Sequence, residues 1–167
     1  MLEDMERVLL SEQQLEARVT ELAAQISRDY REKDPVFVGI LKGSFVFMAD
    51  LMRKVLIPCN IDFMAVSSYG TQSVSTGAVR ISKDLERDIA GRHVVIIEDI
   101  LDSGFTLNCL VEELKGRQPA SIRLCTLLDK PSRRKVPIQA DYCGFEIPDA
   151  FVVGYGLDYD QHYRNLP

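Results

Sequence analysis

The chain has 167 residues, which is enough for one domain with a full hydrophobic core. Its 25 acidic and 20 basic residues leave a net charge of −5, which argues against a general electrostatic grip on nucleic acid or on an anionic membrane. No apolar run approaches the roughly 20 residues of a membrane span, and residues 1–6 are acidic where a signal peptide would be basic. We therefore expect a single domain over residues 1–167, located in the cytoplasm.

Strands and helices are predicted to alternate along the chain, because continuous apolar runs alternate with segments of helical periodicity. Ser11 and Gln14 have the spacing of a capping box at the start of the first helix. Such alternation implies an α/β fold with a mainly parallel sheet, covered by helices and joined by right-handed crossovers. The expected elements are a helix over residues 11–30, a strand over 36–41, a helix over 45–54, a strand over 61–67, a long loop over 69–76, a strand followed by a helix that together cover 94–115, and strands over 122–128 and 151–154.

The segment over residues 94–107 carries the strongest functional signal. Residues 94–97 are four consecutive apolar residues, typical of a strand buried on both faces, and the strand is expected to stop at Glu98 and Asp99. An Asp-Ser-Gly turn follows, and Thr106 opens a helical pattern. A helix N-terminus at the carboxyl end of a strand offers free N–H groups to a phosphate, and the two acids suit ribose hydroxyls or a divalent cation. The alternative is two solvated acids beside an ordinary helix cap.

This segment resembles the phosphoribosyl-pyrophosphate (PRPP) binding motif of type I phosphoribosyltransferases, which is a hydrophobic strand, two acids and an Asp-Ser/Thr-Gly-x-Thr loop. The likeness covers most of the chain and is greatest to bacterial hypoxanthine phosphoribosyltransferases. It implies a mainly parallel five-stranded sheet flanked by helices, with a small hood subdomain formed by the N- and C-terminal segments. The other segments that carry the resemblance are residues 41–44, 67–70, 129–134 and 152–159.

The resemblance implies a complete PRPP site. Glu98 and Asp99 would hold the ribose hydroxyls and water around Mg²⁺, and the loop that begins at Asp102 would cradle the 5′-phosphate. Lys42 would belong to a pyrophosphate loop, which in the family often follows a cis peptide bond; a lone Lys-Gly is also common at a plain surface. A mobile lid would begin at Ser68. The expected PRPP-binding residues are Lys42, Gly43, Ser68, Tyr69, Glu98, Asp99, Asp102, Ser103, Gly104, Phe105, Thr106 and Arg164.

The resemblance also implies a purine site. Asp102 would lie near N7 of the base as the general base, although stabilisation of charge in the transition state would look the same from the sequence. Lys130 would point inward to the purine O6, while Arg133, Arg134 and Lys135 stay at the surface or at a subunit contact. The expected purine-binding residues are Lys130, Phe151, Val152 and Asp158, and the expected metal-binding residues are Glu98, Asp99 and Asp158. The alternatives are a solvated basic cluster and, for Phe151, a place in the core.

The function implied by the resemblance is transfer of the 5-phosphoribosyl group from PRPP to N9 of hypoxanthine and guanine. The reaction would use Mg²⁺, release pyrophosphate and serve purine salvage. The partners would be these small molecules, without nucleic acid or membrane, and the chain would assemble as a homodimer or homotetramer. Two alternatives remain open: a nucleotide-sensing regulatory protein on the same fold, and a phospho-acceptor receiver domain, whose acidic pocket also lies at strand ends.

Overall fold

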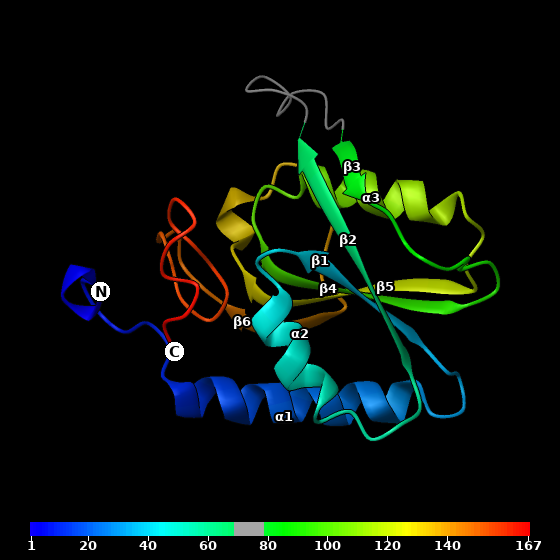
Figure 1. The fold of residues 1–167 in the computed structure, drawn as a ribbon, viewed down its shortest axis with the longest axis horizontal. Helices are drawn as coiled ribbons and strands as arrows, with labels where there is room; N and C mark the ends of the chain where they lie inside the picture. The colour runs from blue at the N-terminus through cyan, green and yellow to red at the C-terminus, as the bar shows by residue number, and fades with distance from the viewer. Residues whose placement is uncertain (69–78) are drawn as a thin grey trace.

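The computed structural model describes residues 1–68 and 79–167. Six strands form one sheet in the order β3-β2-β1-β4-β5-β6 (Figure 1). All neighbouring strands are parallel except β2 and β3, so the predicted α/β class with a mainly parallel sheet is confirmed. The strands are β1 (Val36–Leu41), β2 (Asn60–Ser68), β3 (Val79–Lys83), β4 (His93–Leu101), β5 (Ser121–Asp129) and β6 (Tyr142–Glu146).

Within residues 1–68 and 79–167, three α-helices and two short 3-10 helices accompany the sheet. The capping box predicted at the first helix is present: Ser11 Oγ accepts from the backbone N–H of Gln14 (3.2 Å), and Gln14 Oε1 accepts from the backbone N–H of Ser11 (2.8 Å). This reciprocal pair satisfies two N–H groups that a helix start would otherwise leave free. The helices are α1 (Glu12–Asp29), α2 (Phe45–Met52), α3 (Phe105–Lys115), η1 (Leu2–Asp4) and η3 (Pro131–Arg133).

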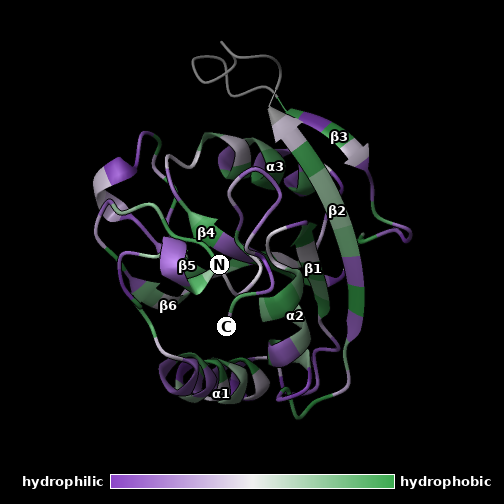
Figure 2. Ribbon diagram, turned by 60° about the vertical axis from the view of Figure 1, so that its left-hand side comes forward, coloured by the Kyte–Doolittle hydropathy of each residue, from purple (hydrophilic) through white to green (hydrophobic). Residues whose placement is uncertain are grey.

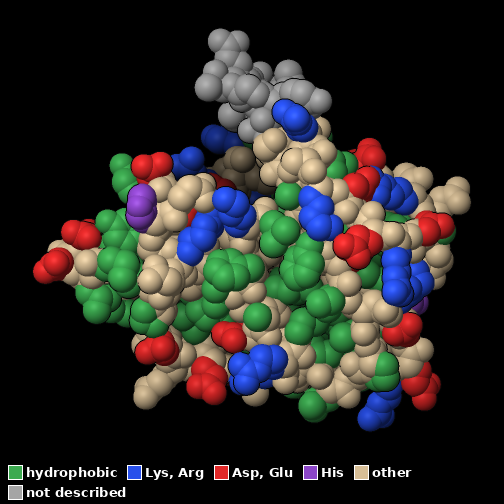
Figure 3. Space-filling view, in the orientation of Figure 1, with side chains coloured by type: hydrophobic (Ala, Val, Ile, Leu, Met, Phe, Trp, Pro, Cys, Tyr) green, Lys and Arg blue, Asp and Glu red, His purple; other side chains and the backbone are tan. Residues whose placement is uncertain are grey.

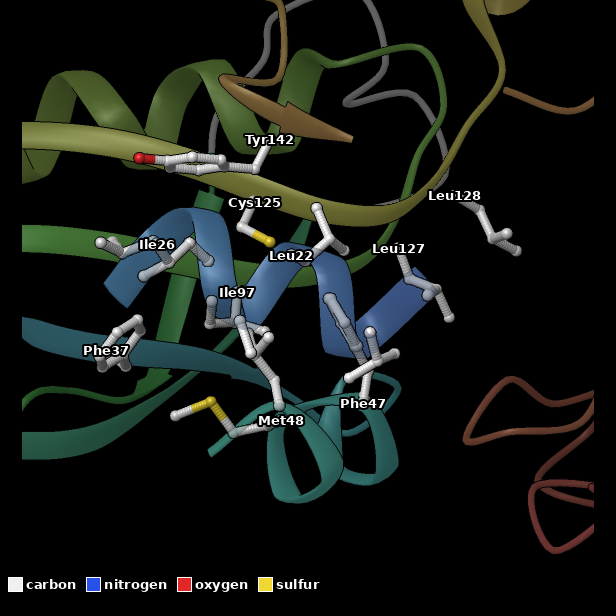
Figure 4. Packing of buried hydrophobic residues seen from close by; sticks show 14 of the residues in the cluster. Leu22, Ile26, Phe37, Phe47, Met48, Ile97, Cys125, Leu127, Leu128 and Tyr142 are labelled. Atoms are coloured by element: carbon white, nitrogen blue, oxygen red, sulfur yellow. The ribbon is translucent and has the colours of Figure 1, made fainter. Parts of the chain in front are cut away.

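The core lies on both faces of the sheet. Helices α1 and α2 cover one face, where their side chains pack with Val95 and Ile97 of β4 (Figure 4). Helix α3 covers the other face, where it packs with Val94 and Ile96. All four of these β4 side chains are fully buried, because neighbouring residues of a strand point to opposite faces. Figure 2 shows the result, with hydrophobic residues on the central strands and hydrophilic residues along the outer side of α1.

Strand β4 does not stop at the acidic pair, so the predicted end at Glu98 is wrong. It continues to Leu101, because Glu98, Ile100 and Leu101 keep their pairing with β5. A strand that loses its apolar character can still run on while the neighbouring strand satisfies its backbone. The acidic pair therefore belongs to the strand itself, and the loop that follows begins at Asp102.

Two strands were missed and one prediction was wrong. Strands β3 and β6 are short edge strands at opposite ends of the sheet, which is why six strands are found where five were expected. The strand predicted over residues 151–154 is absent: residues 151–153 have no regular structure, and Gly154 pairs with Leu157 in a tight turn. At β6, Arg18 of α1 donates to the backbone carbonyls of Gly144 (2.8 Å) and Cys143 (2.7 Å).

The N- and C-terminal segments lie side by side over one end of the molecule (Figure 1). Tyr163 Oη donates to Asp4 Oδ2 (3.2 Å), and Tyr155 Oη donates to Asp50 Oδ2 of α2 (2.5 Å). These contacts place the C-terminal segment between the N-terminus and α2. On the face in view in Figure 3, hydrophobic side chains are exposed over the middle of the molecule, and exposed apolar residues of α2, β2 and their connection include Phe45, Leu56 and Ile61. Within the described residues, no helix combines the length and hydropathy that crossing a membrane requires.

Candidate active site

The candidate site lies where the chain changes direction across the sheet. Strands β1 and β4 are parallel neighbours, and the chain leaves them in opposite directions, from β1 to β2 on one side and from β4 to β5 on the other. Loops that diverge in this way leave a crevice at the carboxyl ends of the two strands, where open α/β sheets bind ligands. Lys42 follows β1 and Asp102 follows β4, so both predicted loops open into this crevice.

The loop after β1 is fitted tightly to the acidic pair. The Leu41–Lys42 peptide bond is cis, and a Cβ atom on Gly43 would overlap Oδ2 of Asp99. The buried Ser44 hydroxyl donates to the carbonyl of Ile40 (2.7 Å), which ties the loop back to its own strand. A side chain at position 43 would therefore require the Asp99 carboxylate to move from the place that it occupies here.

The acidic pair is held by its own backbone. Glu98 Oε1 accepts from the N–H of Asp99 (3.0 Å), and Asp99 Oδ1 accepts from the N–H of Ile100 (2.7 Å). Burial, and after it the nearby Asp99 carboxylate, raises the pKa of Glu98 well above its usual range. Hydroxyl donors or a divalent cation placed beside Glu98 would favour its ionised form.

The described residues contain no cluster of three or more carboxylate, histidine or cysteine side chains that could hold a metal ion. Glu98, Asp99 and Asp158 therefore do not form a single protein cage. This arrangement fits Mg²⁺ better than a metal that needs a full set of protein ligands, since Mg²⁺ usually keeps several waters and binds one or two carboxylates together with phosphate oxygens of the substrate.

The loop between β4 and α3 supplies no side-chain cap for the backbone N–H groups at the start of α3. Gly104 is the N-cap residue of α3, with φ +89°, and it makes no side-chain capping hydrogen bond. The alternative of an ordinary cap by Asp102 or Ser103 is therefore wrong. Phe105 and Thr106 form the first turn of α3, and the N–H groups of an uncapped first turn form an anion site, favoured further by the helix dipole.

Arg134 holds the loop between β4 and α3 in place through three contacts. Its Nε donates to the carbonyl of Asp102 (3.1 Å), its Nη1 donates to the carbonyl of Ile138 (2.7 Å), and its Nη2 pairs with Asp129. The side chain is only 16% exposed, so Arg134 does not stay at the open surface of this chain as expected. The carbonyls and the carboxylate at the end of β5 bury it as a structural cation.

Lys130 points inward, as the resemblance implied. It is 7% exposed, and its N–H donates to the carbonyl of Leu101 (3.0 Å), which holds the end of β5 against the end of β4. Its Nζ lies 4.0 Å from Asp149 Oδ1. Arg133 joins the same group: its Nε lies 2.8 Å from Asp102 Oδ1, and its Nη1 lies 3.5 Å from Asp149 Oδ1.

Phe151 stands in the open rather than in the core. It is 74% exposed, and its ring meets the ring of Tyr159 edge to face, with 5.8 Å between the centroids. Val152, the next residue, is half-buried. An exposed aromatic face beside a partly buried backbone is suited to stacking on a flat ligand.

The C-terminal segment brings a second cation to the loop after β1. Gln161 Oε1 accepts from Lys42 Nζ (3.2 Å) and from Arg164 Nη2 (3.3 Å). Arg164 also donates to the carbonyl of Gly156 (2.7 Å) and pairs with Asp158 (3.3 Å). Asp158 Oδ2 in turn accepts from the N–H of Gln161 (2.8 Å).

The set of residues near the candidate site differs in part from the predicted set. Arg133 stays at the surface as expected, at 50% exposure, but its position beside Asp102 was not predicted. Asp149 and Gln161 were not predicted at all, because one charged or amide side chain in a loop carries no sequence signal of its own. Ser68 ends β2, paired with Val79. Tyr69 and the predicted lid over residues 69–76 lie outside the described residues.

The chain is similar to known proteins over nearly its whole length. Residues 8–160 match the phosphoribosyl transferase domain family. A hypoxanthine-guanine phosphoribosyltransferase of Bacillus subtilis is 53% identical over 167 residues, which cover 100% of this chain and 93% of the relative. A crystal structure of a hypoxanthine phosphoribosyltransferase from Staphylococcus aureus has a TM-score of 0.97 at 51% identity, covering 99% of this chain and 90% of that one. A hypoxanthine phosphoribosyl transferase of Trypanosoma cruzi, described in connection with the role of its C-terminal region in oligomeric state and activity, has a TM-score of 0.92 at 44% identity, covering 96% and 88%.

Proposed function

The chain belongs to the phosphoribosyl transferase family, and from this premise we propose that it transfers the 5-phosphoribosyl group of PRPP to N9 of hypoxanthine and guanine in purine salvage. Pyrophosphate is released, and IMP or GMP is formed. The regulatory alternative finds no support in the relatives, which are named as phosphoribosyltransferases. The fold and the family match leave no role for a receiver domain.

One observation carries the proposal: the loop suited to a phosphate and the loop suited to a base are joined side by side. Arg134 donates to the carbonyl of Asp102 and pairs with Asp129, so the end of β5 is anchored to the loop after β4. Asp102 thereby lies between the free N-terminus of α3 and the buried Lys130. A sugar phosphate on one side and a purine on the other would meet at Asp102.

In the proposed reaction, the 5′-phosphate binds the first-turn N–H groups of α3, with the hydroxyls of Ser103 and Thr106. The ribose hydroxyls donate to Glu98 and Asp99. The purine N9 forms a bond to C1′ of the sugar while the bond from C1′ to pyrophosphate breaks, and pyrophosphate leaves with that electron pair. Asp102 accepts the proton that N7 loses.

Pyrophosphate is proposed to bind the loop after β1 and the C-terminal segment. Lys42 and Arg164 supply positive charge there, and both already converge on one oxygen of Gln161. Glu98 and Asp99 would hold Mg²⁺ through water, and Asp158 would help to hold a second Mg²⁺; the bound ions would neutralise the dense negative charge of PRPP and of the leaving group.

The base is proposed to stack on Phe151, with backbone groups of Val152 at its edge. Lys130 would donate to the purine O6. An ammonium group has donors and no acceptor, so it matches a 6-oxo group and mismatches the 6-amino group of adenine. A buried mismatch of this kind costs more than a missing contact, which makes the site selective for 6-oxopurines.

The test is an assay of PRPP with hypoxanthine, guanine, xanthine and adenine, run on the unmodified chain and on Asp102→Asn. We expect turnover with hypoxanthine and guanine, and a fall in kcat of about 10²-fold or more for the variant, because the amide keeps the loop shape and removes the base. Glu112→Gln, an exposed carboxylate on α3, is the matched control. Equal turnover by Asp102→Asn would remove Asp102 from the proton transfer, and no turnover with any base would refute the function.

We further propose that the enzyme acts in the cytoplasm and assembles as a homodimer or homotetramer. The exposed apolar side chains of α2 and β2 in Figure 3 support assembly, since exposed apolar patches commonly mark interfaces. Light scattering on the eluting protein would give the mass of the assembly, and a monomeric mass at all concentrations would contradict this part of the proposal.

A further inference from the structure

Four charged side chains of alternating sign form a row beside the candidate base site. The row runs from Asp102 to Arg133, then to Asp149, and ends at Lys130. Arg133 Nε lies 2.8 Å from Asp102 Oδ1 and Arg133 Nη1 lies 3.5 Å from Asp149 Oδ1, while Lys130 Nζ lies 4.0 Å from the same Asp149 oxygen. The two ends directly follow β4 and β5, and the two inner members come from η3 and the segment after β6.

The two ends of this charge row face neighbouring atoms of one ligand in the proposed function. N7 and O6 lie next to each other on the same edge of a 6-oxopurine, and Asp102 and Lys130 are the groups assigned to them. The carboxylate and the ammonium must therefore each lie within hydrogen-bond distance of their own atom at the same time. Arg133 and Asp149 are the side chains that link the two groups.

A contribution to folding stability does not explain why Arg133 and Asp149 form these ion pairs. The side chains of Arg133 and Asp149 are 50% and 55% exposed, and exposed ion pairs contribute little to folding. Arg134, the neighbouring cation, is 16% exposed and already holds the loop through two carbonyls and Asp129. The loop therefore has its structural anchor without Arg133.

We propose that Arg133 and Asp149 are positioning residues for the base: Arg133 orients the Asp102 carboxylate toward N7, and Asp149 orients Arg133 and keeps Lys130 aimed at O6. The inference rests on the proposed function, because it takes from it the roles of Asp102 and Lys130. A small displacement of a catalytic group costs rate rather than binding when the group acts mainly in the transition state. Loss of Arg133 should therefore lower kcat and leave PRPP binding intact.

The experiment compares Arg133→Met with Lys135→Met, an exposed cation two residues further along the same loop. We expect Arg133→Met to lower kcat with hypoxanthine about 10-fold, with the KM for PRPP and the thermal midpoint unchanged. Lys135→Met should match the unmodified chain, and Arg133→Lys should recover part of the loss because it restores the charge. Asp149→Asn should also lower kcat, since it acts on Asp102 through Arg133 and on Lys130 directly.

A double-mutant cycle separates positioning from other roles. If Arg133 acts through Asp102, adding Arg133→Met to Asp102→Asn should change kcat less than about twofold. Equal factors in both backgrounds would overturn the inference. A raised KM for PRPP with unchanged kcat would also overturn it, because Arg133 would then bind a phosphate directly. The unmodified chain and Asp102→Asn alone test the proposed function, so its failure is seen independently of Arg133.

Discussion

Gly43 lies directly against the carboxylate of Asp99, so that a Cβ atom at position 43 would overlap Oδ2. Gly43 follows β1 and Asp99 lies near the carboxyl end of the neighbouring strand β4, where the loops of the two strands diverge at the crevice. This contact joins the loop proposed for pyrophosphate to the pair proposed for the ribose hydroxyls. The position of one depends on the absence of a side chain in the other.

Gly43→Ala should therefore disable the enzyme while leaving it folded. The methyl group must displace Asp99, which lies in a paired strand, or push back the loop after β1; either change separates groups that have to act together. We expect kcat/KM for PRPP to fall about 10²-fold or more, with a similar far-ultraviolet spectrum. Gly116→Ala, at the end of α3, is the control, since the nearest atom there is a single carbonyl at 3.3 Å. Full activity of Gly43→Ala would contradict the close fit.

Lys130→Met should narrow the choice of base. Methionine keeps much of the volume of lysine and removes the donor, so the 6-oxo group loses its partner and the 6-amino group loses an opposing cation. We expect kcat/KM for hypoxanthine to fall about 10²-fold or more and the preference over adenine to shrink, with the KM for PRPP little changed. Steady-state assays with both bases measure this. A variant that used hypoxanthine as well as the unmodified chain would make Lys130 a structural lysine only.

Glu98→Gln should stabilise the unliganded protein, and more so as the pH rises. Burial, and to a lesser extent the neighbouring Asp99, raises the pKa of Glu98 in the folded protein. An unfolded glutamate has a pKa of about 4.3. At pH values between that pKa and the raised folded pKa, the folded state binds more protons than the unfolded state. Stability is lost with rising pH over that range, and each pKa unit of elevation corresponds to about 1.4 kcal/mol. The amide removes the loss and still accepts from the N–H of Asp99. Urea unfolding at pH 5 and pH 8 should show the larger gain at pH 8, whereas Glu112→Gln should show no such trend; a constant gain would argue against the assigned cause.

Gln161→Glu should weaken pyrophosphate binding. The neutral amide oxygen accepts from Lys42 and Arg164 without cancelling their charge, whereas a carboxylate would hold both cations and oppose an incoming anion. Calorimetric titration with magnesium pyrophosphate should give a Kd about 10-fold higher. Gln118→Glu is a matched control, because Gln118 is also exposed and also has a positive φ (61° against 65°) but follows α3. Equal weakening in both variants would mean that net charge alone is responsible.

Removal of divalent cations should abolish turnover. The substrate brings a high negative charge to a site that already contains Glu98, Asp99 and Asp158, and Lys42 and Arg164 are partly occupied by Gln161 and Asp158. Excess chelator should therefore stop the reaction, and added Mg²⁺ should restore it. Sustained activity in the chelator would contradict the proposed metal requirement.

The sequence predicts the fold where local and long-range signals agree. The capping box at Ser11 and the apolar run over residues 94–97 each fix an element by themselves, and both elements are present. Strand β3 is short, with charged Arg80 and Lys83 among its five residues, so it lacks the continuous apolar run of the central strands. The end of β4 was missed for another reason: pairing with β5 keeps the strand intact beyond its apolar part.

The sequence predicts which loops form the candidate site, but it predicts only in part which side chains of those loops face it. Lys130 and Asp102 follow strands, and the sheet topology brings strand ends together. Arg133 and Arg134 are adjacent and identical in type, yet one lies beside Asp102 and the other is buried against Asp129. Their difference comes from the short helix η3, which turns successive side chains in different directions, and no pattern in a single sequence encodes it.

The guanidinium of Arg18, on α1, affects the edge strand β6. An edge strand with unpaired backbone groups is a template on which another strand can add. Arg18 donates to two successive carbonyls of β6, so part of the hydrogen-bonding capacity of that border is already used within the same chain. A single long side chain thereby occupies backbone acceptors at this edge strand, which would make the addition of a further strand at β6 less favourable.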